Sequence, residues 1–549
     1  IAHVRGLSHG DKLIATVLGG AFAVSLLASL YTLESQFLVE VPSNGGTLTE
    51  GIVGAPRFVN PLLAVADADR GLTMLTYAGL MGYDASGRLI PVLAESYDVS
   101  EDGKTYTFVI RKGAEFSDGT PITADDVVFT VEKAQNPAIK SPELANWANV
   151  DAVAIDSRTV RFTLAKAYAP FLTDTTLGIM PARLWRDVSD AEFPFSPLMS
   201  EPVGAGPFRI ESIARDKEGV VKSYRLKANS RYALGRPYLD SLTFIYFKDA
   251  DELKDALARG RVESAYGVPS PTAMRIPYSR VFGIFFNQGQ NPLYARAEVR
   301  KALSAAVNRD ALVQNVLGGY AVPLTGPVPP GIGAEIPVAT TSENPAEDAK
   351  AILSAAGWKF DEDAKMWKLA SQKLSLTVAL KTANVPELKA IAERAKNDFE
   401  AAGVPTEVEL YDPSTLATDI IRPRKFDTLL FGMVVGRDRD LFAFWDSSER
   451  NDPGLNVAQY ANRKVDDLLE KLRGETDPSA IAADLTAVNS LIAADYPAVF
   501  LEAPEFLYTL PADMKGVAIT HVATPPDRLL GIAGWYRHTE WVWPGFSSE

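Results

Sequence analysis

The pattern of apolar and polar positions in residues 89–132 predicts strands, a turn and a capped helix. Apolar residues at every second position of 106–110 predict a strand with one buried face, because successive side chains of an extended backbone point to opposite sides. Gly103 lies in the turn before it and can adopt the positive φ that such connections often need. Thr123 is a predicted N-cap, and the apolar residues of 124–131 recur at helical spacing. This stretch predicts a compact α+β unit and by itself indicates no function.

Beyond residue 340, predicted helices alternate with predicted strands. Helices predicted at 345–356 and 386–402 begin at a proline, which suits the first turn of a helix, and each precedes a strand, at 374–381 and 406–410. Residues 426–435 form another apolar run that is typical of a buried strand. This alternation predicts a mixed α/β fold in which helices pack on a sheet.

An apolar run near the N-terminus predicts a membrane span. Residues 13–33 contain no charged side chain, and at 1.5 Å per residue they extend about 31 Å, enough to cross the hydrocarbon core. The run is longer than the apolar part of a cleavable signal peptide, so we predict an uncleaved signal anchor, with cleavage as the alternative. Arg5 and Lys12 precede the run and predict a cytoplasmic tail at 1–12, with residues 34–46 as a tether to an extracytoplasmic body.

Composition limits the possible partners and chemistry. The 549 residues exceed the size of one hydrophobic core and predict roughly two to four domains. A net charge of −14 argues against nucleic acid as a partner, because phosphate binding needs a basic surface. The chain has no cysteine, which excludes disulfides, thiolate metal sites, a cysteine nucleophile and a lipidated cysteine.

Candidate catalytic and metal-binding motifs each have a simpler interpretation. Residues 6–10 match the G-x-S-x-G pattern of serine hydrolases but precede the apolar run instead of forming a strand–turn–helix elbow. Residues 67–71 resemble a calcium loop without the length and final Glu of an EF-hand, and four scattered histidines predict no transition-metal site. Paired acids at 125–126 and 466–467 suit helix starts, although a secreted hydrolase using a carboxylate pair stays an alternative. We predict no catalytic residue, no metal and no cofactor.

Aromatic side chains are frequent between residues 534 and 546. They suit either packing against the body or contact with a membrane interface. Packing is the favoured interpretation, because Trp and Tyr are well buried on average.

A long motif in the region described first resembles a known family. It comprises Leu93-Ala94-Glu95-Ser96-Tyr97, Asp102-Gly103, Tyr106-Thr107-Phe108, Arg111-Lys112-Gly113, Phe116, Asp118-Gly119-Thr120-Pro121 and Ala124-Asp125-Asp126-Val127. This order of turns and aromatic residues resembles the family 5 solute-binding proteins, the extracytoplasmic peptide and nickel receptors of bacterial ABC importers. The resemblance extends from about residue 46 to about residue 516.

The resemblance implies a two-lobed, periplasmic-binding-protein-like fold of type II, cluster C, with an extra inserted domain. Domain I of the first lobe would comprise residues 47–83, 203–277 and 506–549, and the inserted domain II would comprise residues 84–202. Domain III, residues 278–505, would form the second lobe. Such lobes close on a ligand like a hinge, and peptide ligands lie extended between them.

The ligand contacts implied by the resemblance lie on both lobes. Val65-Ala66-Asp67 matches the ligand-lining strand of the first lobe, and residues 432–436 match its partner across the cleft, although an ordinary buried strand end would explain the second segment equally well. The full set of predicted contacts is Val65, Ala66, Asp67, Asn287, Gly432, Met433, Val434, Val435, Gly436, Arg437, Asp438 and Trp445.

The chain departs from its relatives at two charged positions. Peptide-binding members carry an aspartate for the ligand's amino group where Gly436 stands, and Asp438 is a possible substitute. Dipeptide receptors carry an arginine for the ligand's carboxylate where Thr382 stands. These departures argue against a strict dipeptide receptor and leave longer peptides, capped peptides or another solute open.

We therefore expect a single-pass membrane protein, not an enzyme, that captures peptides outside the cell and delivers them to ABC permease and ATPase subunits. The alternatives are a protein of the same fold for a nickel chelate or an oligosaccharide, and a surface receptor or chaperone without a transport role.

Overall fold

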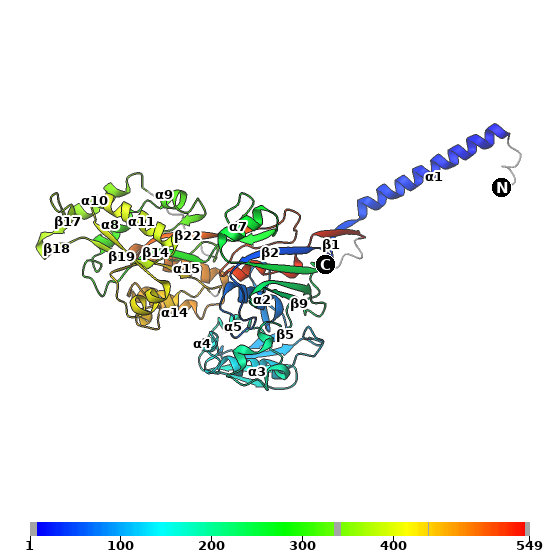
Figure 1. The fold of residues 1–549 in the computed structure, drawn as a ribbon, viewed down its shortest axis with the longest axis horizontal. Helices are drawn as coiled ribbons and strands as arrows, with labels where there is room; N and C mark the ends of the chain where they lie inside the picture. The colour runs from blue at the N-terminus through cyan, green and yellow to red at the C-terminus, as the bar shows by residue number, and fades with distance from the viewer. Residues whose placement is uncertain (1–7, 334–341, 438, 544–549) are drawn as a thin grey trace.

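The computed structural model describes residues 8–333, 342–437 and 439–543 of the chain. Helix α1 (His9–Phe37) projects from a body made of two lobes (Figure 1). Its segment His9–Ser29 has a mean hydropathy of 1.7, and none of it is buried against the rest of the described chain. This helix has the length and composition of a membrane anchor or a signal sequence.

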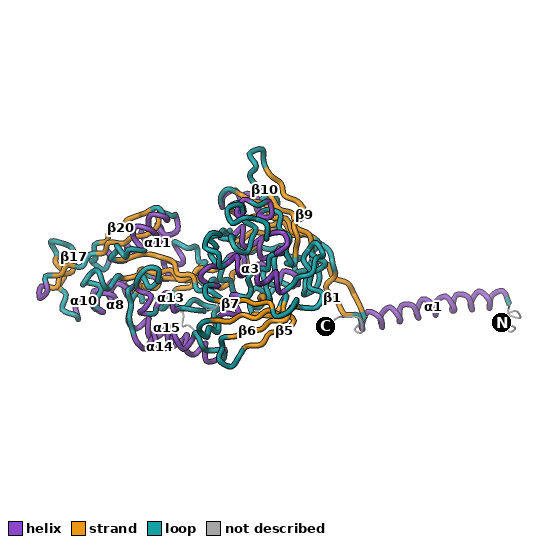
Figure 2. Tube along the Cα trace, turned by 90° about the horizontal axis from the view of Figure 1, so that it is seen from below, coloured by secondary structure: helices purple, strands orange, loops and turns teal. Residues whose placement is uncertain are grey.

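The strand that follows α1 pairs with the C-terminal part of the chain. Strand β1 (Val39–Ser43) runs antiparallel to β23 (His538–Val542), with Val39 opposite Val542. Residues 34–46, predicted as a tether, therefore include a paired strand, and both ends of the body meet at the base of α1 (Figure 2).

A sheet of twelve strands runs through both lobes in the order β20-β19-β21-β14-β22-β12-β2-β11-β10-β9, with β13 and β15 also paired to β22. We assign the strands from β2 to β13 to lobe 1 and those from β14 to β21 to lobe 2. The lobe 1 strands of this sheet are β2 (Thr47–Val53), β9 (Phe208–Arg215), β10 (Val221–Ala228), β11 (Ser241–Phe247), β12 (Ser264–Tyr266) and β13 (Met274–Pro277). The lobe 2 strands are β14 (Arg280–Phe286), β15 (Ala321–Pro323), β19 (Val378–Ala383), β20 (Thr406–Tyr411) and β21 (Thr428–Val434).

Strand β22 (Ala498–Thr509) joins the two lobes. Its first half pairs with β14 of lobe 2, with Glu502 opposite Phe282, and its second half pairs with β13 of lobe 1, with Tyr508 opposite Met274. The chain crosses a second time between β13 and β14, at Tyr278. The domain boundaries at 277/278 and 505/506 stay predictions.

Residues 94–185 form a separate unit with a sheet of its own, which we call the inserted unit, and the bounds 84–202 for this domain stay a prediction. Its four-stranded sheet has the order β5-β6-β8-β7 and is covered by α3 (Ala124–Ala134). The N-cap predicted at Thr123 is confirmed and forms a capping box, in which the Thr123 amide donates to Asp126 Oδ2 at 2.9 Å. The other elements of this unit and its surroundings are α2 (Asp67–Thr76), β3 (Met81–Tyr83), β4 (Leu89–Pro91), β5 (Ala94–Val99), β6 (Thr105–Ile110), α4 (Leu144–Trp147), β7 (Val150–Ala154), β8 (Thr159–Leu164), α5 (Phe171–Asp174) and α6 (Ala182–Trp185). Helix α7 (Ala250–Ala258) packs instead on β2, β11 and β12 of lobe 1.

Lobe 2 has the α/β layering that the sequence predicts. Ile284 and Leu430 pack with helices on one side of the sheet, and Phe285 and Leu429 pack on the other side. The predicted strand at 374–381 is split into β18 (Leu374–Ser375) and β19. The remaining elements of lobe 2 are α8 (Ala297–Ala306), α9 (Arg309–Asn315), α10 (Pro345–Ala355), β16 (Lys359–Asp361), β17 (Met366–Leu369), α11 (Pro386–Ala401), α12 (Pro413–Thr415), the π-helix Leu416–Ile421, α13 (Phe442–Trp445), α14 (Arg463–Leu472) and α15 (Pro478–Asp495).

Candidate ligand-binding site

The predicted lobe 1 contact segment is not a strand in the structure. Val65 is irregular, Ala66 is the N-cap of α2, and Asp67 begins that helix. The helix starts here because the Ala66 carbonyl accepts the Arg70 amide at 2.9 Å and the Asp67 carboxylate favours the helix N-terminus. Val65 is 60% exposed, so it is accessible to a ligand although the strand assignment was wrong.

Strand β21 presents an open edge at its C-terminal end. The Val435 amide donates to the Ser279 carbonyl at 2.9 Å, so odd-numbered residues direct their backbone groups toward β14. Backbone direction alternates along an antiparallel pair, and Gly432 and Val434 therefore direct theirs to the other side. On that side the described part of β19 pairs only with the start of β21, where Lys381 lies opposite Leu429. We call the backbone of Gly432 and Val434 the free edge of β21.

A small apolar pocket lies beside the free edge. Its volume is about 220 Å³, and we call it the lobe 2 pocket. Gly432 contributes to its wall, and a Cβ at this position would lie 2.6 Å from a ring carbon of Phe282, so a larger residue could not fit without displacing that ring. Its lining is Arg280, Phe282, Ala383, Leu388, Pro413, Leu416, Ala417, Ile421, Phe431, Gly432 and Val434. An extended ligand along β21 could place one apolar side chain here.

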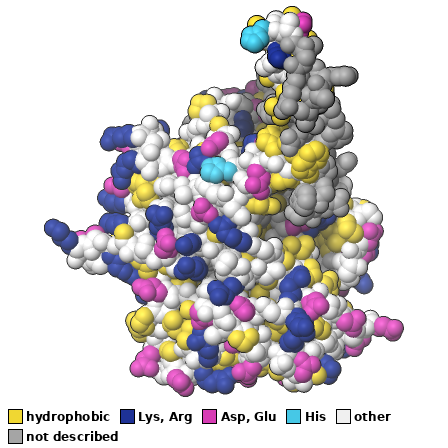
Figure 3. All heavy atoms as spheres, turned by 90° about the vertical axis from the view of Figure 1, so that its right-hand side faces the viewer, with side chains coloured by type: hydrophobic (Ala, Val, Ile, Leu, Met, Phe, Trp, Pro, Cys, Tyr) yellow, Lys and Arg dark blue, Asp and Glu magenta, His cyan; other side chains and the backbone are white. Residues whose placement is uncertain are grey.

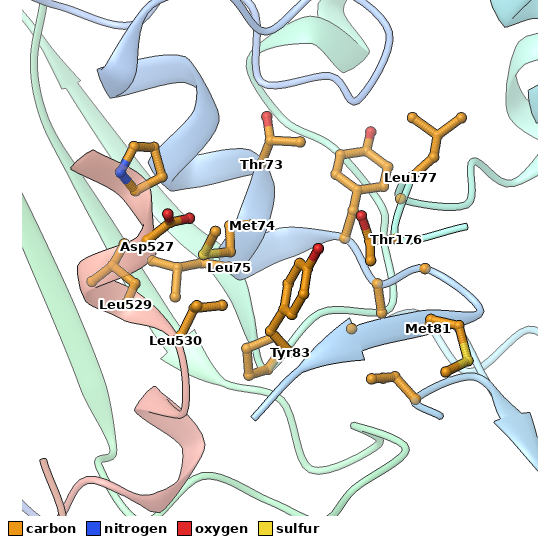
Figure 4. Close-up of a pocket in the computed structure, with 18 of the residues that line it drawn as sticks. Thr73, Met74, Leu75, Met81, Tyr83, Thr176, Leu177, Asp527, Leu529 and Leu530 are labelled. Carbon is orange, nitrogen blue, oxygen red and sulfur yellow. The ribbon is translucent and has the colours of Figure 1, made fainter. Parts of the chain in front are cut away.

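A larger cavity of about 640 Å³ lies in lobe 1, at the junction with the inserted unit. Figure 4 shows how its wall is assembled from separate segments: Thr73, Met74 and Leu75 from α2, Tyr83 from β3, and Thr176 with Leu177 from the inserted unit. The 3₁₀ helix that includes Leu529 closes another side. We call it the lobe 1 cavity.

The lobe 1 cavity is lined by more acidic than basic groups. Asp84, Glu143, Asp174 and Asp527 line it, against a single guanidinium from Arg70. Burial raises the pKa of the Glu143 carboxyl, against the opposing effects of the Asn146 hydrogen bond and Arg70. Burial also acts to raise the pKa of Asp84, but hydrogen bonds from Ser86 and Arg88 outweigh it and lower that pKa to about 2. Asp84 is paired with Arg88 at 2.9 Å and Asp527 with Arg437 at 3.1 Å, so cations outside the lining offset two of these carboxylates.

Arg437 contacts the wall of this cavity from lobe 2. Its Nε lies 3.1 Å from Asp527 Oδ2, and its Nη2 donates to the His521 carbonyl at 3.0 Å. Its guanidinium also lies over the ring of Tyr83, 5.4 Å from the centroid. The Arg437 side chain is only 10% exposed. Arg437 was a predicted ligand contact, and in the structure it joins the two lobes.

The structure brings some predicted contacts together and separates others. Gly432 and Val434 lie at the free edge, whereas Met433 and Val435 point into the lobe 2 core. Asn287 is buried, and its side-chain amide donates to the Arg424 carbonyl at 3.0 Å. It follows the end of β14 that lies away from the lobe 2 pocket. Gly436 directly precedes Arg437 in the connecting loop, and Asp438 lies outside the described residues.

Trp445 is a core residue in this structure. It is fully buried and packs near Phe285, Tyr460 and Phe500, with ring centroids 5.7 to 6.0 Å away. It has no surface for a ligand, so its aromatic character reflects packing and not recognition.

The residues that line the lobe 1 cavity were missed by the sequence analysis. They come from stretches that are far apart in the sequence, among them 70–85, 143–146, 173–178 and 524–534, which no local motif connects. The charged groups among them resemble ordinary surface residues in the sequence, and only the fold brings them together.

Within the described chain, no group of three or more His, Cys, Asp or Glu side chains is arranged to hold a metal ion. The two-lobed fold, the free edge and the cavity are the features of a ligand-binding protein.

Comparison with known proteins identifies the family. Residues 88–452, more than half of the chain, match the model for "Bacterial extracellular solute-binding proteins, family 5 Middle", and the chain belongs to this family. It is 26% identical over 499 residues to the oligopeptide-binding protein AppA of Bacillus subtilis, covering 86% of this chain and 89% of the relative. It is 27% identical over 498 residues to the glutathione-binding protein GsiB of Escherichia coli K12, covering 86% and 90%.

Solved structures share the whole architecture of the body. AppA from Bacillus subtilis in complex with a nonapeptide has a TM-score of 0.68 at 25% identity, covering 90% of this chain and 99% of AppA. The substrate-binding protein CtaP from Listeria monocytogenes has a TM-score of 0.72 at 24% identity, with 90% and 99% covered, and supports the fold alone. The expected periplasmic-binding-protein-like fold is confirmed, and the family consists of substrate-binding proteins.

Proposed function

We propose that this chain captures peptides between its lobes at the outer face of a bacterial membrane and delivers them to an ABC importer. Helix α1 would hold the body at the membrane, and permease and ATPase subunits would supply the energy for transport. The chain itself would carry out no chemistry.

The free edge of β21 is the observation on which this proposal chiefly depends. Gly432 and Val434 present backbone groups that no described strand pairs with, beside an apolar pocket, which is the arrangement that an extended peptide recognises by strand addition. Backbone hydrogen bonds are indifferent to the ligand's sequence, so they favour a receptor that accepts many peptides. The related AppA structure holds a nonapeptide, which supports an oligopeptide over a strict dipeptide.

The proposal is tested by measuring peptide binding to the full chain in lipid nanodiscs. Native mass spectrometry with a pool of unmodified peptides of graded length should detect bound peptides. A response only to nickel chelates or oligosaccharides would contradict the peptide assignment while leaving the family intact.

A pair of variants at Val434 tests the free edge itself. Val434→Pro removes an outward-pointing N–H that no described strand uses, and should weaken peptide binding by about fivefold or more. Val434→Ala keeps that N–H and is the matched control, expected to change affinity less. Equal affinities for the two variants would contradict strand addition.

A further inference from the structure

The short ribbon formed by β1 and β23 exposes an unusual amount of aromatic surface. Trp541 is 62% exposed, Trp543 is 46% exposed, and Val39 on the neighbouring strand is 44% exposed. The other six tryptophans of the chain are at most 5% exposed, so packing explains those and not these two. Trp535, in the same aromatic-rich tail, is fully buried, so the tail divides into a packed part and an exposed part.

The ribbon begins directly after α1. That helix ends at Phe37, β1 starts at Val39, and the register places Trp541 opposite Glu40 and Val542 opposite Val39. Trp543 directly follows Val542, the last residue of β23, so it lies close to the C-terminal end of α1. Figure 3 shows the face from which α1 projects, where hydrophobic side chains interrupt a surface of mixed charges.

The length of α1 places this ribbon at the membrane surface if the helix spans a bilayer. Twenty-nine helical residues extend about 43 Å, close to the thickness of a bilayer with its headgroup layers. A helix of this length ends at the outer boundary of the headgroups, and tilt would lower that end further. The two exposed indoles then lie at the depth that Trp prefers, with its apolar ring among lipid and its N–H near water.

We propose that the β1–β23 ribbon is a membrane-contact surface and that Trp541 and Trp543 insert into the headgroup layer of a zwitterionic bilayer. This inference rests on the proposed anchoring by α1. Glu40 and Glu540 are exposed on the same ribbon, and only Glu40 has an ion pair in the described chain, with Lys515 at 3.3 Å, so strongly anionic lipid is disfavoured. The contact would fix the orientation of the body on its helix, and with it the face turned toward the transporter.

The distribution of tryptophan allows a direct test with the full chain. The protein is reconstituted in nanodiscs of phosphatidylcholine or of brominated phosphatidylcholine, in which bromine quenches indole fluorescence only at short range. We expect partial quenching of the wild type and its near loss in the Trp541→Phe/Trp543→Phe double variant, because the six other indoles are buried in the body. Thermal unfolding of the variant should be unchanged, since neither side chain is buried.

The controls separate this inference from the proposed function. If the protein does not co-purify with the nanodisc, the anchoring itself is wrong. If it co-purifies and binds peptide but brominated lipid does not quench it, the membrane contact is wrong and the proposed function stands. Protection of the two indoles from aqueous iodide without quenching by brominated lipid would mean that a protein surface covers them, which also overturns the inference.

Discussion

Arg437 of lobe 2 and Asp527 of lobe 1 form an ion pair across the two halves of the molecule, with Nε and Oδ2 3.1 Å apart. The side chains are 10% and 9% exposed, so the pair is largely removed from water. The Asp527 carboxylate also accepts the amides of Ala523 and Thr524, which fixes its position. Arg437 follows the free edge of β21 by three residues, so the contact between lobes lies next to the proposed peptide site.

Removal of Arg437 should loosen the link between the lobes. Arg437→Ala leaves Asp527 without its cationic partner, and we expect the free energy of unfolding to fall by about 2 kcal/mol. Peptide affinity should fall as well, because the lobes would be held less firmly around the ligand. Urea unfolding and calorimetric titration measure the two effects.

Arg259→Ala is the matched control for this change. Arg259 and Asp255 form a surface pair in which both side chains are at least 70% exposed, and its loss should cost no more than about 0.5 kcal/mol. Equal effects of the two substitutions would show that the contact between the lobes contributes nothing specific.

A second buried ion pair stabilises the interior of lobe 1. Glu50 of β2 and Arg528 are 0% and 1% exposed, and the Glu50 carboxylate also accepts the Tyr508 hydroxyl at 2.8 Å. Glu50→Gln leaves a buried guanidinium without its counter-charge, and we expect a loss of about 3–5 kcal/mol in unfolding free energy. Retention of the wild-type melting temperature would contradict this role.

His521 should make the protein less stable in acid. Burial and the neighbouring Arg437 lower the pKa of its ring from 6.5 to about 4, so the folded state favours the neutral ring. The preference of the folded state for the neutral ring costs no stability above pH 6.5. As the pH falls toward 4, the free energy of unfolding decreases by up to about 3 kcal/mol. His521→Gln should flatten the pH dependence of the melting temperature in this range. An unchanged profile would exclude His521 as its cause.

Glu502 should make the protein less stable as the pH rises, which is the opposite of the effect of His521. Both of its carboxylate oxygens are buried without a hydrogen-bond partner in the described chain, and burial with repulsion from Glu387 raises its pKa well above the ordinary value. The folded state favours the protonated acid, so its ionisation becomes more costly as the pH rises. Glu502→Gln should therefore increase the melting temperature more at about pH 8 than at about pH 5. A gain that is larger in acid would contradict this assignment.

The sequence predicts elements whose signals are local. The Thr123 capping box, the proline-led starts of α10 and α11, and the apolar α1 all depend on residues close together in the chain, and the structure places helices at each. The strand predicted at Val65 was wrong because the acidic residues at 67 and 69 favour a helix start, a local signal that the resemblance to a family overrode.

The candidate site was less predictable, because its residues are brought together only by tertiary structure. Gly432 and Val434 could be placed on a strand, but the open side of that strand depends on how far β19 extends beside it. Trp445 and Arg437 both follow a buried strand, and nothing local distinguishes the residue that enters the core from the one that crosses to lobe 1. The lobe 1 cavity arises where several chain segments that are far apart in sequence meet.

The most direct test of the central claim is whether peptide draws the lobes together. The absence of native cysteine permits a clean pair of spin labels, at Ala138→Cys on the inserted unit of lobe 1 and Lys464→Cys on α14 of lobe 2, both exposed. Electron–electron double resonance on the full chain should give a shorter and narrower distance distribution when peptide is added, because the ligand binds the closed arrangement more tightly. A distance distribution that stays the same while peptide is demonstrably bound would contradict the account of two lobes clamping a peptide.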